Sequence, residues 1–262
     1  MAQKIEKIKM FIDTYVPVTT CNLRCHYCYI TQQRLFSEEL PSFKYSSETV
    51  FKALSKERLG GVCHFNICGG GETLLPSQMT DYIRVILEQG HYVMVVTNGT
   101  ISKRFDEIIR LPQELLSRLC FKFSYHYIEL KKKGLMEQFF ENIQKVREAG
   151  CSFSLELLPC DEAIPLIGEI MQLAKEKVGA VCHVTVARDD ASPMRDKPIL
   201  SQLSRADYEK TWDIFNSEMF SYKLSIFGNK RKEFCYAGVW SAYLNLGTGE
   251  IQQCYCNFSL QS

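Results

Sequence analysis

Short apolar runs alternate with longer amphipathic stretches along most of this chain, and glycine marks many of the junctions. Six apolar runs are predicted to be strands, at residues 9–16, 62–67, 92–96, 120–125, 152–157 and 181–187. Helices are predicted between them, at about residues 46–56, 76–89, 102–118, 135–149 and 164–177. Strands separated by helices of this length form right-handed βαβ units, so we expect an α/β fold with a parallel sheet. Six units are too few for a closed eight-stranded barrel, which leaves an open, partial barrel or a doubly wound sheet.

The alternation of apolar runs and amphipathic stretches ends after residue 187. Residues 188–201 contain a pair of aspartates and two prolines and are predicted to be a connecting loop. Residues 204–207 resemble a capping box, which predicts a helix from there to about residue 219. Residues 239–255 alternate in polarity around Gly247-Thr248-Gly249, which indicates a β-hairpin. We therefore expect a core at residues 1–200, followed at residues 201–262 by a helix and a small β-hairpin extension.

Composition excludes several classes of partner. The 262 residues are 46% hydrophobic, enough for one large core. Lys and Arg number 31 against 30 Asp and Glu, so no broad cationic field attracts nucleic acid. The N-terminus is charged, without the apolar core of a signal peptide, and no apolar run approaches bilayer length. The sequence predicts a soluble, cytoplasmic protein with no nucleic-acid or membrane partner.

Twelve cysteines are many for such a chain. Without an export signal they are expected to stay reduced and available to soft metals, with iron–sulfur clusters as the leading expectation. Four of them lie at or near the start of apolar runs, where free cysteine behaves as a small buried hydrophobe: Cys63, Cys120, Cys151 and Cys182.

Cys21, Cys25 and Cys28 form a C-x3-C-x2-C motif directly after the first predicted strand. Three thiolates on one short loop suit a four-iron cluster whose last iron stays open, which indicates chemistry on a bound small molecule. The carboxyl ends of the strands are where sites gather in such sheets. Two other interpretations are an iron–sulfur electron carrier, which would need four cysteines per cluster, and a zinc-binding interaction module. A zinc ion would need a fourth ligand such as His64, because His26 lies too close between two of the cysteines.

With Tyr27 before the third cysteine, this motif resembles the signature of the radical S-adenosylmethionine (SAM) enzymes, whose fold is a partial (β/α)6, TIM-like barrel. Gly69 to Glu72, after the second strand, looks like the family's glycine-rich turn, although Thr73 stands where the family usually has proline. The resemblance assigns cofactor contacts to Tyr27, Gly70, Gly71, Glu72, Thr97, Asn98, Ser124 and Glu156. Glycine suits the turn because backbone approaches a ligand closely only where no side chain intervenes.

The resemblance also implies an activity. Cys21, Cys25 and Cys28 would hold a [4Fe-4S] cluster that cleaves SAM reductively to a 5′-deoxyadenosyl radical, and the radical would abstract hydrogen from a substrate carbon. It implies an oxidoreductase or maturase that modifies a peptide or protein or converts a small metabolite, with a low-potential electron donor such as flavodoxin or ferredoxin. From position at the strand ends, we expect substrate contacts at Tyr125, His126, Arg188 and Asp189. The roughly twenty residues before Cys21 leave no room for a leader-peptide-binding domain.

The C-terminal segment carries a second resemblance. Cys235, Gly249 and Cys254 follow the spacing that opens the SPASM/twitch-type extension of many radical SAM enzymes. That extension holds auxiliary iron–sulfur clusters, so Cys235, Cys254 and Cys256 are expected to serve an auxiliary cluster. Cys254 and Cys256 would share one face of a strand. Three thiolates are few for such a cluster, which favours the interpretation that the sequence is a fragment with further ligands beyond Ser262.

Overall fold

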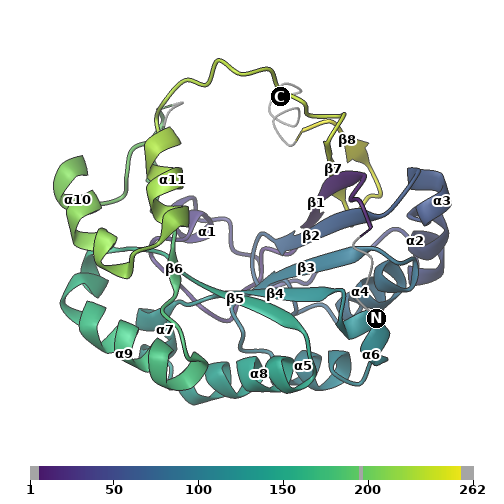
Figure 1. The fold of residues 1–262 in the computed structure, drawn as a ribbon, viewed down its shortest axis with the longest axis horizontal. Helices are drawn as coiled ribbons and strands as arrows, with labels where there is room; N and C mark the ends of the chain where they lie inside the picture. Colours follow the sequence, from purple (N-terminus) through teal and green to yellow (C-terminus); the bar gives the residue numbers. More distant parts are fainter. Residues whose placement is uncertain (1–5, 195–196, 255–262) are drawn as a thin grey trace.

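The computed structural model describes residues 6–194 and 197–254. Its strands are β1 (Met10–Val16), β2 (Cys63–Gly69), β3 (Tyr92–Thr97), β4 (Leu119–Ser124), β5 (Ser152–Leu157), β6 (His183–Val184), β7 (Ser241–Asn245) and β8 (Ile251–Gln252). They form one sheet in the order β6-β5-β4-β3-β2-β1-β7-β8. Every neighbouring pair is parallel except β7 and β8, which are antiparallel. The sheet curves without closing, as an open partial barrel does (Figure 1).

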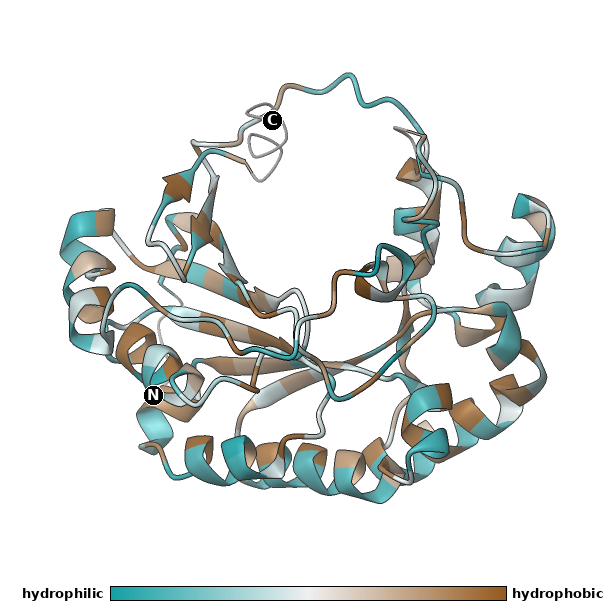
Figure 2. Ribbon diagram, turned by 180° about the vertical axis from the view of Figure 1, so that it is seen from behind, coloured by the Kyte–Doolittle hydropathy of each residue, from teal (hydrophilic) through white to brown (hydrophobic). Residues whose placement is uncertain are grey.

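Helices cover the outer side of this curved sheet (Figure 1). They are α2 (Ser47–Ala53), α3 (Lys56–Leu59), α4 (Met79–Glu88), α5 (Ser102–Ile108), α6 (Gln113–Leu116), α7 (Tyr127–Lys132), α8 (Met136–Glu148) and α9 (Ile167–Val178). The short helix α1 (Tyr29–Gln32) follows the cysteine motif, and η1 (Asp161–Leu166) precedes α9. Beyond β6 come α10 (Arg205–Trp212), η2 (Asp213–Phe215) and α11 (Glu218–Ile226). The outer helices carry hydrophobic residues toward the sheet and hydrophilic ones outward (Figure 2).

The core lies between the sheet and these helices. In β4, Leu119, Phe121 and Phe123 are buried, while the alternate residues are only partly buried. Successive side chains of a strand point to opposite faces, so one face of β4 supplies the core. Phe121 and Phe123 contact each other and Phe105 of α5, with ring centroids 5.4–5.8 Å apart. Burying each such ring contributes about 1.5–3 kcal/mol. The opposite, more polar face is left for the inside of the partial barrel.

The first five predicted strands are confirmed to within two residues, but the sixth is wrong in length. Residues 181–187 were expected to form it, and only His183 and Val184 pair with β5. The helix expected at residues 102–118 is two helices, because proline disfavours helical geometry in the residue before it and Pro112 is the N-cap of the second. The helix expected to reach residue 219 ends at Trp212, after which Asn216 takes a left-handed conformation (φ 47°) and α11 begins.

The predicted hairpin is confirmed as β7 and β8, which pair through Tyr243 with Gln252 and Leu244 with Ile251. Its attachment was not expected. β7 runs parallel to β1, so that the hairpin extends the main sheet, and Tyr15 stacks on Tyr243 with ring centroids 6.2 Å apart. Periodicity along the chain carries no information about such a distant partner.

Cysteine burial follows the sequence interpretation at three of four positions. Cys63, Cys151 and Cys182 are buried in the core, whereas Cys120, on the more polar face of β4, is only partly buried. Over the residues that the structure describes, no helix has the length and apolar character needed to cross a bilayer.

Candidate functional site

The segment between β1 and the cysteine motif lies against the glycine turn that follows β2. The Gly71 amide donates a hydrogen bond to the Val18 carbonyl oxygen at 2.5 Å, and the Glu72 amide donates to that of Thr20 at 3.0 Å. β1 and β2 are parallel neighbours, which brings their carboxyl ends together. The motif and the turn, about 50 residues apart in sequence, therefore form one unit.

Glycine is required in this turn by the protein's own backbone. A Cβ on Gly71 would lie 2.1 Å from the Thr20 carbonyl oxygen, and one on Gly70 would lie 2.9 Å from that of Val18. Neither glycine has a positive φ, so close approach is the reason and not backbone conformation. From the sequence we expected these glycines to admit a cofactor. In the structure the atoms that approach them belong to the segment leading to Cys21.

Glu72 is buried and ties the turn to the end of β3. One carboxylate oxygen accepts hydrogen bonds from the Thr97 hydroxyl at 2.6 Å and from the Leu74 amide at 3.0 Å. The other oxygen accepts from the Asn98 amide at 2.7 Å. Burial raises the pKa of Glu72, and these hydrogen bonds act in the opposite direction by stabilising the carboxylate.

Asn98 extends this network to the cysteine loop. Its side-chain nitrogen donates to the Asn22 side-chain oxygen at 2.8 Å and lies 3.7 Å from Cys21 Sγ as a donor. Its side-chain oxygen accepts from the Thr100 hydroxyl at 2.7 Å. Asn98 thus links the first cysteine of the motif to the end of β3.

The three cysteines of the motif line a common cavity. Its walls also include Gly70, Gly71, Glu72, Thr97, Asn98, Ser124 and His126. Burial is the main cause that raises the pKa of Cys21, to about 11, and it also raises the pKa of Cys25 and of Cys28. The structure brings these predicted site residues together around one space, which we call the inner cavity.

Spacing distinguishes the motif from a single-ion site. In the described part of the chain, one group of at least three His, Cys, Asp or Glu side chains brings its ligand atoms within 4.8 Å of one another, and Cys21, Cys25 and Cys28 are not in it. A single zinc ion needs its ligands that close, whereas a cube of four irons spaces its thiolates more widely. His64, considered from the sequence as a fourth zinc ligand, stacks on Phe11 with ring centroids 5.5 Å apart and is not part of the inner cavity wall.

Tyr27 and His126 join the cysteine loop to the end of β4. The Tyr27 hydroxyl and His126 Nδ1 lie 3.0 Å apart, within hydrogen-bond distance. Burial lowers the pKa of His126 to about 4, so that its imidazole is neutral at pH 7. A neutral imidazole can form a hydrogen bond with a tyrosine hydroxyl, and it places no charge beside the thiols.

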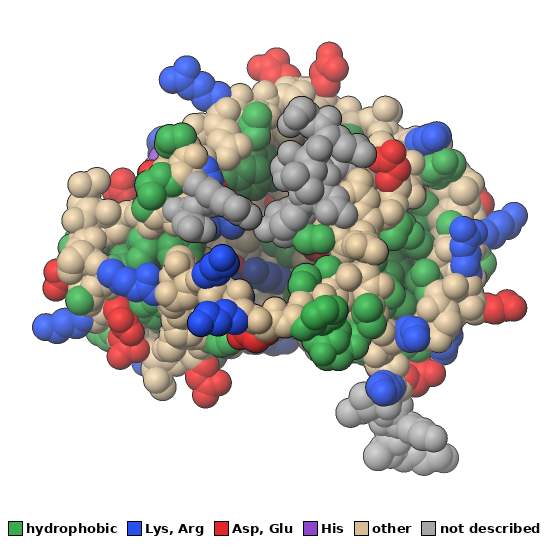
Figure 3. All heavy atoms as spheres, turned by 90° about the horizontal axis from the view of Figure 1, so that it is seen from above, with side chains coloured by type: hydrophobic (Ala, Val, Ile, Leu, Met, Phe, Trp, Pro, Cys, Tyr) green, Lys and Arg blue, Asp and Glu red, His purple; other side chains and the backbone are tan. Residues whose placement is uncertain are grey.

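A second cavity adjoins the first on the side of α11. Cys28 and His126 line both cavities, and Tyr27 of the cysteine loop lines the second. We call it the outer cavity. Glu156, Arg188, Asp190 and Lys223 also line it. The molecule is hollowed on this open side, and Lys and Arg side chains gather around the hollow (Figure 3).

Glu156 does not line the inner cavity, although the resemblance assigned it a cofactor contact. Its carboxylate pairs with Lys122 of β4 at 2.8 Å and with Lys223 of α11 at 3.2 Å. Burial of Glu156 acts to raise its pKa, but the two ammonium groups outweigh that effect, so the net shift is downward. Two lysines on one carboxylate leave a net positive charge beside the outer cavity.

Two expected substrate contacts lie elsewhere. Tyr125 is fully buried and stacks on Phe139 with ring centroids 5.4 Å apart, so the structure places it in the core and not at either cavity. The Asp189 carboxylate accepts from the amides of Ala191 and Ser192 at 3.1 Å and shapes its own loop. Asp190, the next residue, lines the outer cavity instead.

The C-terminal cysteines are less fully described. Cys235 is exposed in the segment between α11 and β7, and Cys254 follows β8. We expected Cys254 and Cys256 to share one face of a strand. That expectation is wrong for Cys254, because the strand ends at Gln252. Cys256 lies outside the described residues.

Sequence reasoning missed several residues at these cavities. Cys68 lines the inner cavity, and Lys122 pairs with Glu156. Strand alternation was the available signal, because Lys122 shares its face of β4 with Ser124. No feature of the sequence indicated Lys223, because the helix that contains it was not predicted.

Comparison with known proteins identifies the family. The sequence profile of the Radical SAM superfamily matches residues 15–159, from the last residues of β1 to just past the end of β5. No curated protein sequence matches this chain.

Solved structures share the fold at low sequence identity. SuiB of Streptococcus suis bound to S-adenosylmethionine is 13% identical, with a TM-score of 0.65, and the match covers 97% of this chain and 62% of SuiB. SuiB bound to the precursor peptide SuiA gives 12% identity, a TM-score of 0.60, and coverage of 97% and 61%. For anSMEcpe with AdoMet and the Cp18Cys peptide, the identity is 16%, the TM-score 0.57, and the coverage 94% and 74%.

A radical SAM methyltransferase of Sphaerobacter thermophilus is 14% identical with a TM-score of 0.51, and the match covers 91% of this chain and 69% of that one. The chain thus spans about 62% of the length of SuiB. Because the family profile covers more than half of the sequence and follows its β1-to-β5 units, the chain belongs to the Radical SAM superfamily of enzymes.

Proposed function

We propose that this protein binds a [4Fe-4S] cluster through Cys21, Cys25 and Cys28 and cleaves S-adenosylmethionine reductively in the inner cavity. The observation that carries the proposal is the convergence of the three thiols, the glycine turn and the ends of β3 and β4 on that one cavity. Cys21, Cys25 and Cys28 would hold the cluster, which when bound would supply the electron for reductive cleavage of S-adenosylmethionine and so the radical that would abstract hydrogen from a substrate carbon.

The residues of the chain would hold and orient these groups. Asn98 lies as a donor 3.7 Å from Cys21 Sγ, and the Leu23 amide lies 3.4 Å from the same atom. Hydrogen bonds to a sulfur that ligates a cluster stabilise its negative charge. Thr97, Asn98 and Ser124 offer polar groups on the wall facing the thiols, suited to the ribose and the amino-acid end of the cofactor. Glu72 acts through its hydrogen bonds to Thr97 and Asn98, because its own oxygens are already engaged.

The test is the formation of 5′-deoxyadenosine by anaerobically reconstituted protein, reduced with dithionite and mixed with S-adenosylmethionine. We expect this product from the wild type and none from a Cys21/Cys25/Cys28→Ala variant. Cys182→Ala, which removes a buried core cysteine, is the matched control and should keep the activity. A wild-type protein that holds four irons per chain more than the Cys21/Cys25/Cys28→Ala variant, and that forms no 5′-deoxyadenosine, would overturn the proposal.

We further propose that the outer cavity receives the substrate and that the substrate is a peptide. Tyr27 and His126 connect this cavity to the cysteine loop, and Arg188 and Lys223 bring positive charge to its wall. The peptide-bound structures of SuiB and anSMEcpe support a peptide over a small metabolite. The reaction would then be an oxidative modification or maturation of the peptide, with reducing equivalents from a low-potential donor such as flavodoxin or ferredoxin.

Substrate class is measurable before the substrate is identified. A peptide fraction of a cell extract should increase 5′-deoxyadenosine formation, and prior digestion with a protease should abolish the increase. Stimulation by the protease-resistant small-molecule fraction alone would refute the peptide assignment while leaving the cleavage of S-adenosylmethionine intact.

The proposal also covers the role of the C-terminal cysteines and the division of the chain into two segments. We propose a core at residues 1–200 and a C-terminal segment at 201–262 in which Cys235, Cys254 and Cys256 serve an auxiliary cluster. Iron and sulfide counts in the Cys21/Cys25/Cys28→Ala protein test this directly, because any remaining iron must be held outside the motif. No residual iron would refute the auxiliary cluster.

A further inference from the structure

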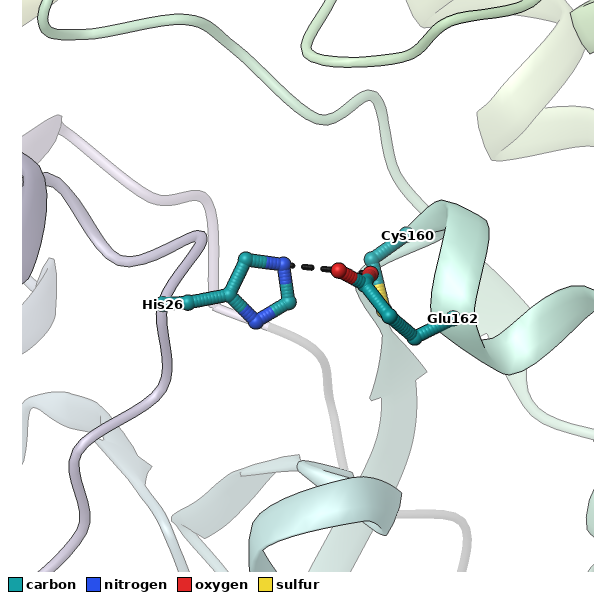
Figure 4. A group of neighbouring side chains, drawn as sticks. All are labelled: His26, Cys160 and Glu162. Carbon is teal, nitrogen blue, oxygen red and sulfur yellow. Dashed lines mark ion pairs between the residues drawn. The ribbon is translucent and has the colours of Figure 1, made fainter.

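A second group of ligating side chains lies beside the cysteine loop, outside both cavities. His26 of the loop points toward Cys160 and Glu162, which come from the segment between β5 and α9 (Figure 4). Their ligand atoms all lie within 4.8 Å of one another. His26 Nε2 is 3.2 Å from a Glu162 carboxylate oxygen.

The three side chains line a pocket of their own. His26, Cys160 and Glu162 share its wall with Asp161 and Ser201, and none of the three lines the inner cavity. Asp161 is not available as a fourth ligand, because its carboxylate accepts from the Ser201 hydroxyl at 2.5 Å and from the Gln202 amide at 2.6 Å. The pocket is open to solvent, which leaves room for a water molecule or another small ligand.

An ion pair alone does not account for this arrangement. The side chains of His26 and Glu162 are 50% and 58% exposed, and a pair so exposed contributes at most about 1 kcal/mol. Cys160, by contrast, is 2% exposed, and its thiol is hydrogen-bonded to the Glu162 carboxylate, so a buried thiol joins the exposed pair. One imidazole, one thiol and one carboxylate converging on a point are the ligand types that zinc binds.

We propose that His26, Cys160 and Glu162 bind one Zn²⁺ ion and thereby fasten the cysteine loop to the segment that follows β5. The thiol and imidazole disfavour Ca²⁺ and Mg²⁺, which take oxygen ligands. In binding, Cys160 releases its proton to solvent and no electron is transferred. Thiolate and carboxylate then balance the charge of the ion while the histidine stays neutral. Three protein ligands leave one position of a tetrahedron for water.

The geometry needs only small movements. At zinc–nitrogen and zinc–oxygen distances of about 2.1 Å and a zinc–sulfur distance of about 2.3 Å, tetrahedral ligand atoms lie about 3.4–3.6 Å apart. No two of the ligand atoms are more than 4.8 Å apart, so the widest spacing must close by at most about 1 Å, and the 3.2 Å between His26 and Glu162 needs no closing. Rotation of the two exposed side chains provides this movement. The backbone of Cys160 is fixed at the N-cap of η1, where its carbonyl oxygen accepts from the Ala163 amide at 3.0 Å.

The site would act on the loop that carries two of the motif cysteines. His26 lies between Cys25 and Cys28, and Cys160 lies more than 130 residues later. An ion shared by the two segments cross-links them, and binding that favours the folded chain raises its stability. The inference does not depend on cleavage of S-adenosylmethionine, since it uses none of the residues of the inner cavity.

Zinc content of the purified protein tests the proposal. The background carries Cys235→Ser, Cys254→Ser and Cys256→Ser, so that the C-terminal thiols bind no metal, and its iron–sulfur cluster is reconstituted first. After incubation with Zn²⁺ and desalting, elemental analysis should find about one zinc per chain, with the iron content unchanged. Added Cys160→Ser should lower the zinc affinity at least 100-fold, because changes that only support a ligand already cost about 10–100-fold. Cys151→Ser, at another buried cysteine, is the matched control and should keep the zinc.

Two further measurements keep the result unambiguous. Glu162→Gln alters an exposed residue without disturbing the core and should weaken zinc binding at least 10-fold, while far-ultraviolet circular dichroism stays unchanged. Co²⁺ in place of Zn²⁺ should give a thiolate-to-metal charge-transfer band that disappears in Cys160→Ser and persists in Cys151→Ser. Absence of zinc and of the cobalt band from the background protein would overturn the proposal, and so would equal binding by Cys160→Ser.

Discussion

Replacing Gly71 with alanine should displace the segment that leads into the cysteine motif. The added Cβ would lie 2.1 Å from the Thr20 carbonyl oxygen, whereas a Cβ does not approach a heavy atom closer than 3.0 Å. The backbone next to Cys21 must therefore move by about 1 Å, because a carbonyl oxygen cannot rotate away as a side chain does. The φ of Gly71 is not positive, so the effect is steric alone.

The cost follows from the contacts at this point. Overpacking of this kind costs about 1–3 kcal/mol. The movement also weakens the hydrogen bonds from the Gly71 amide to Val18 and from the Glu72 amide to Thr20, each worth about 1 kcal/mol. We expect a total loss of about 2–4 kcal/mol in the free energy of unfolding, which leaves a typical domain folded but weakened. The cysteine loop should then retain less iron after reconstitution.

Urea titration followed by circular dichroism measures the stability, and iron analysis measures the retained cluster. The matched control is Gly168→Ala in α9, where an added Cβ meets no heavy atom within 4 Å and helix propensity favours alanine by about 1 kcal/mol. That variant should be as stable as the wild type or more so. If Gly71→Ala stays within about 0.5 kcal/mol of the wild type, as surface substitutions do, the steric argument is refuted.

Three further variants test other parts of the structure. Ser204→Ala removes the N-cap of α10, whose hydroxyl accepts from the Asp207 amide at 3.1 Å, and should cost about 1 kcal/mol in urea titration; an unchanged midpoint would argue against the cap. Tyr125→Phe deletes a buried hydroxyl that has no partner among the described residues, so thermal unfolding should show no loss of stability and a gain of up to about 1 kcal/mol, whereas a clear loss would mean that the hydroxyl is bonded. Burial lowers the pKa of His126 to about 4, below the value near 6.5 of the unfolded chain, so its contribution to stability is complete above pH 6.5 and is lost as pH falls from there toward 4. Between pH 7 and pH 5 the wild type should lose about 2 kcal/mol more stability than His126→Gln, and equal losses would contradict the assignment.

The parallel core of the fold could be predicted from the sequence because its information is local. Strands β1 to β5 coincide with apolar runs, and a run of that kind between amphipathic stretches needs no distant partner to be recognised. The prediction failed where a neighbour decides the structure. Only two residues of the sixth run find a pairing partner, and β7 becomes a strand of the main sheet because β1 offers it a free edge.

The same division holds for the candidate site. The spacing of Cys21, Cys25 and Cys28, followed by a glycine turn and ordered strand ends, indicated the chemistry without coordinates. Parallel topology then guarantees that the strand ends meet at one edge. Which side chains face the cavity and which face the core is a matter of register, and this is why Tyr125 lies among aromatic rings while Lys122 reaches the inside of the barrel.

Tertiary structure alone decided the partners of these residues. The burial of Glu72, the lowered pKa of His126 and the pairing of Glu156 with a lysine of α11 all depend on groups that lie far apart in sequence. His26 likewise meets Cys160 only after β5 has taken its place in the sheet. Residue spacing encodes the elements and the motif, because both are short-range patterns. Hydrogen bonds, desolvation and ligand geometry act between side chains in space, so they become defined only when the chain is folded.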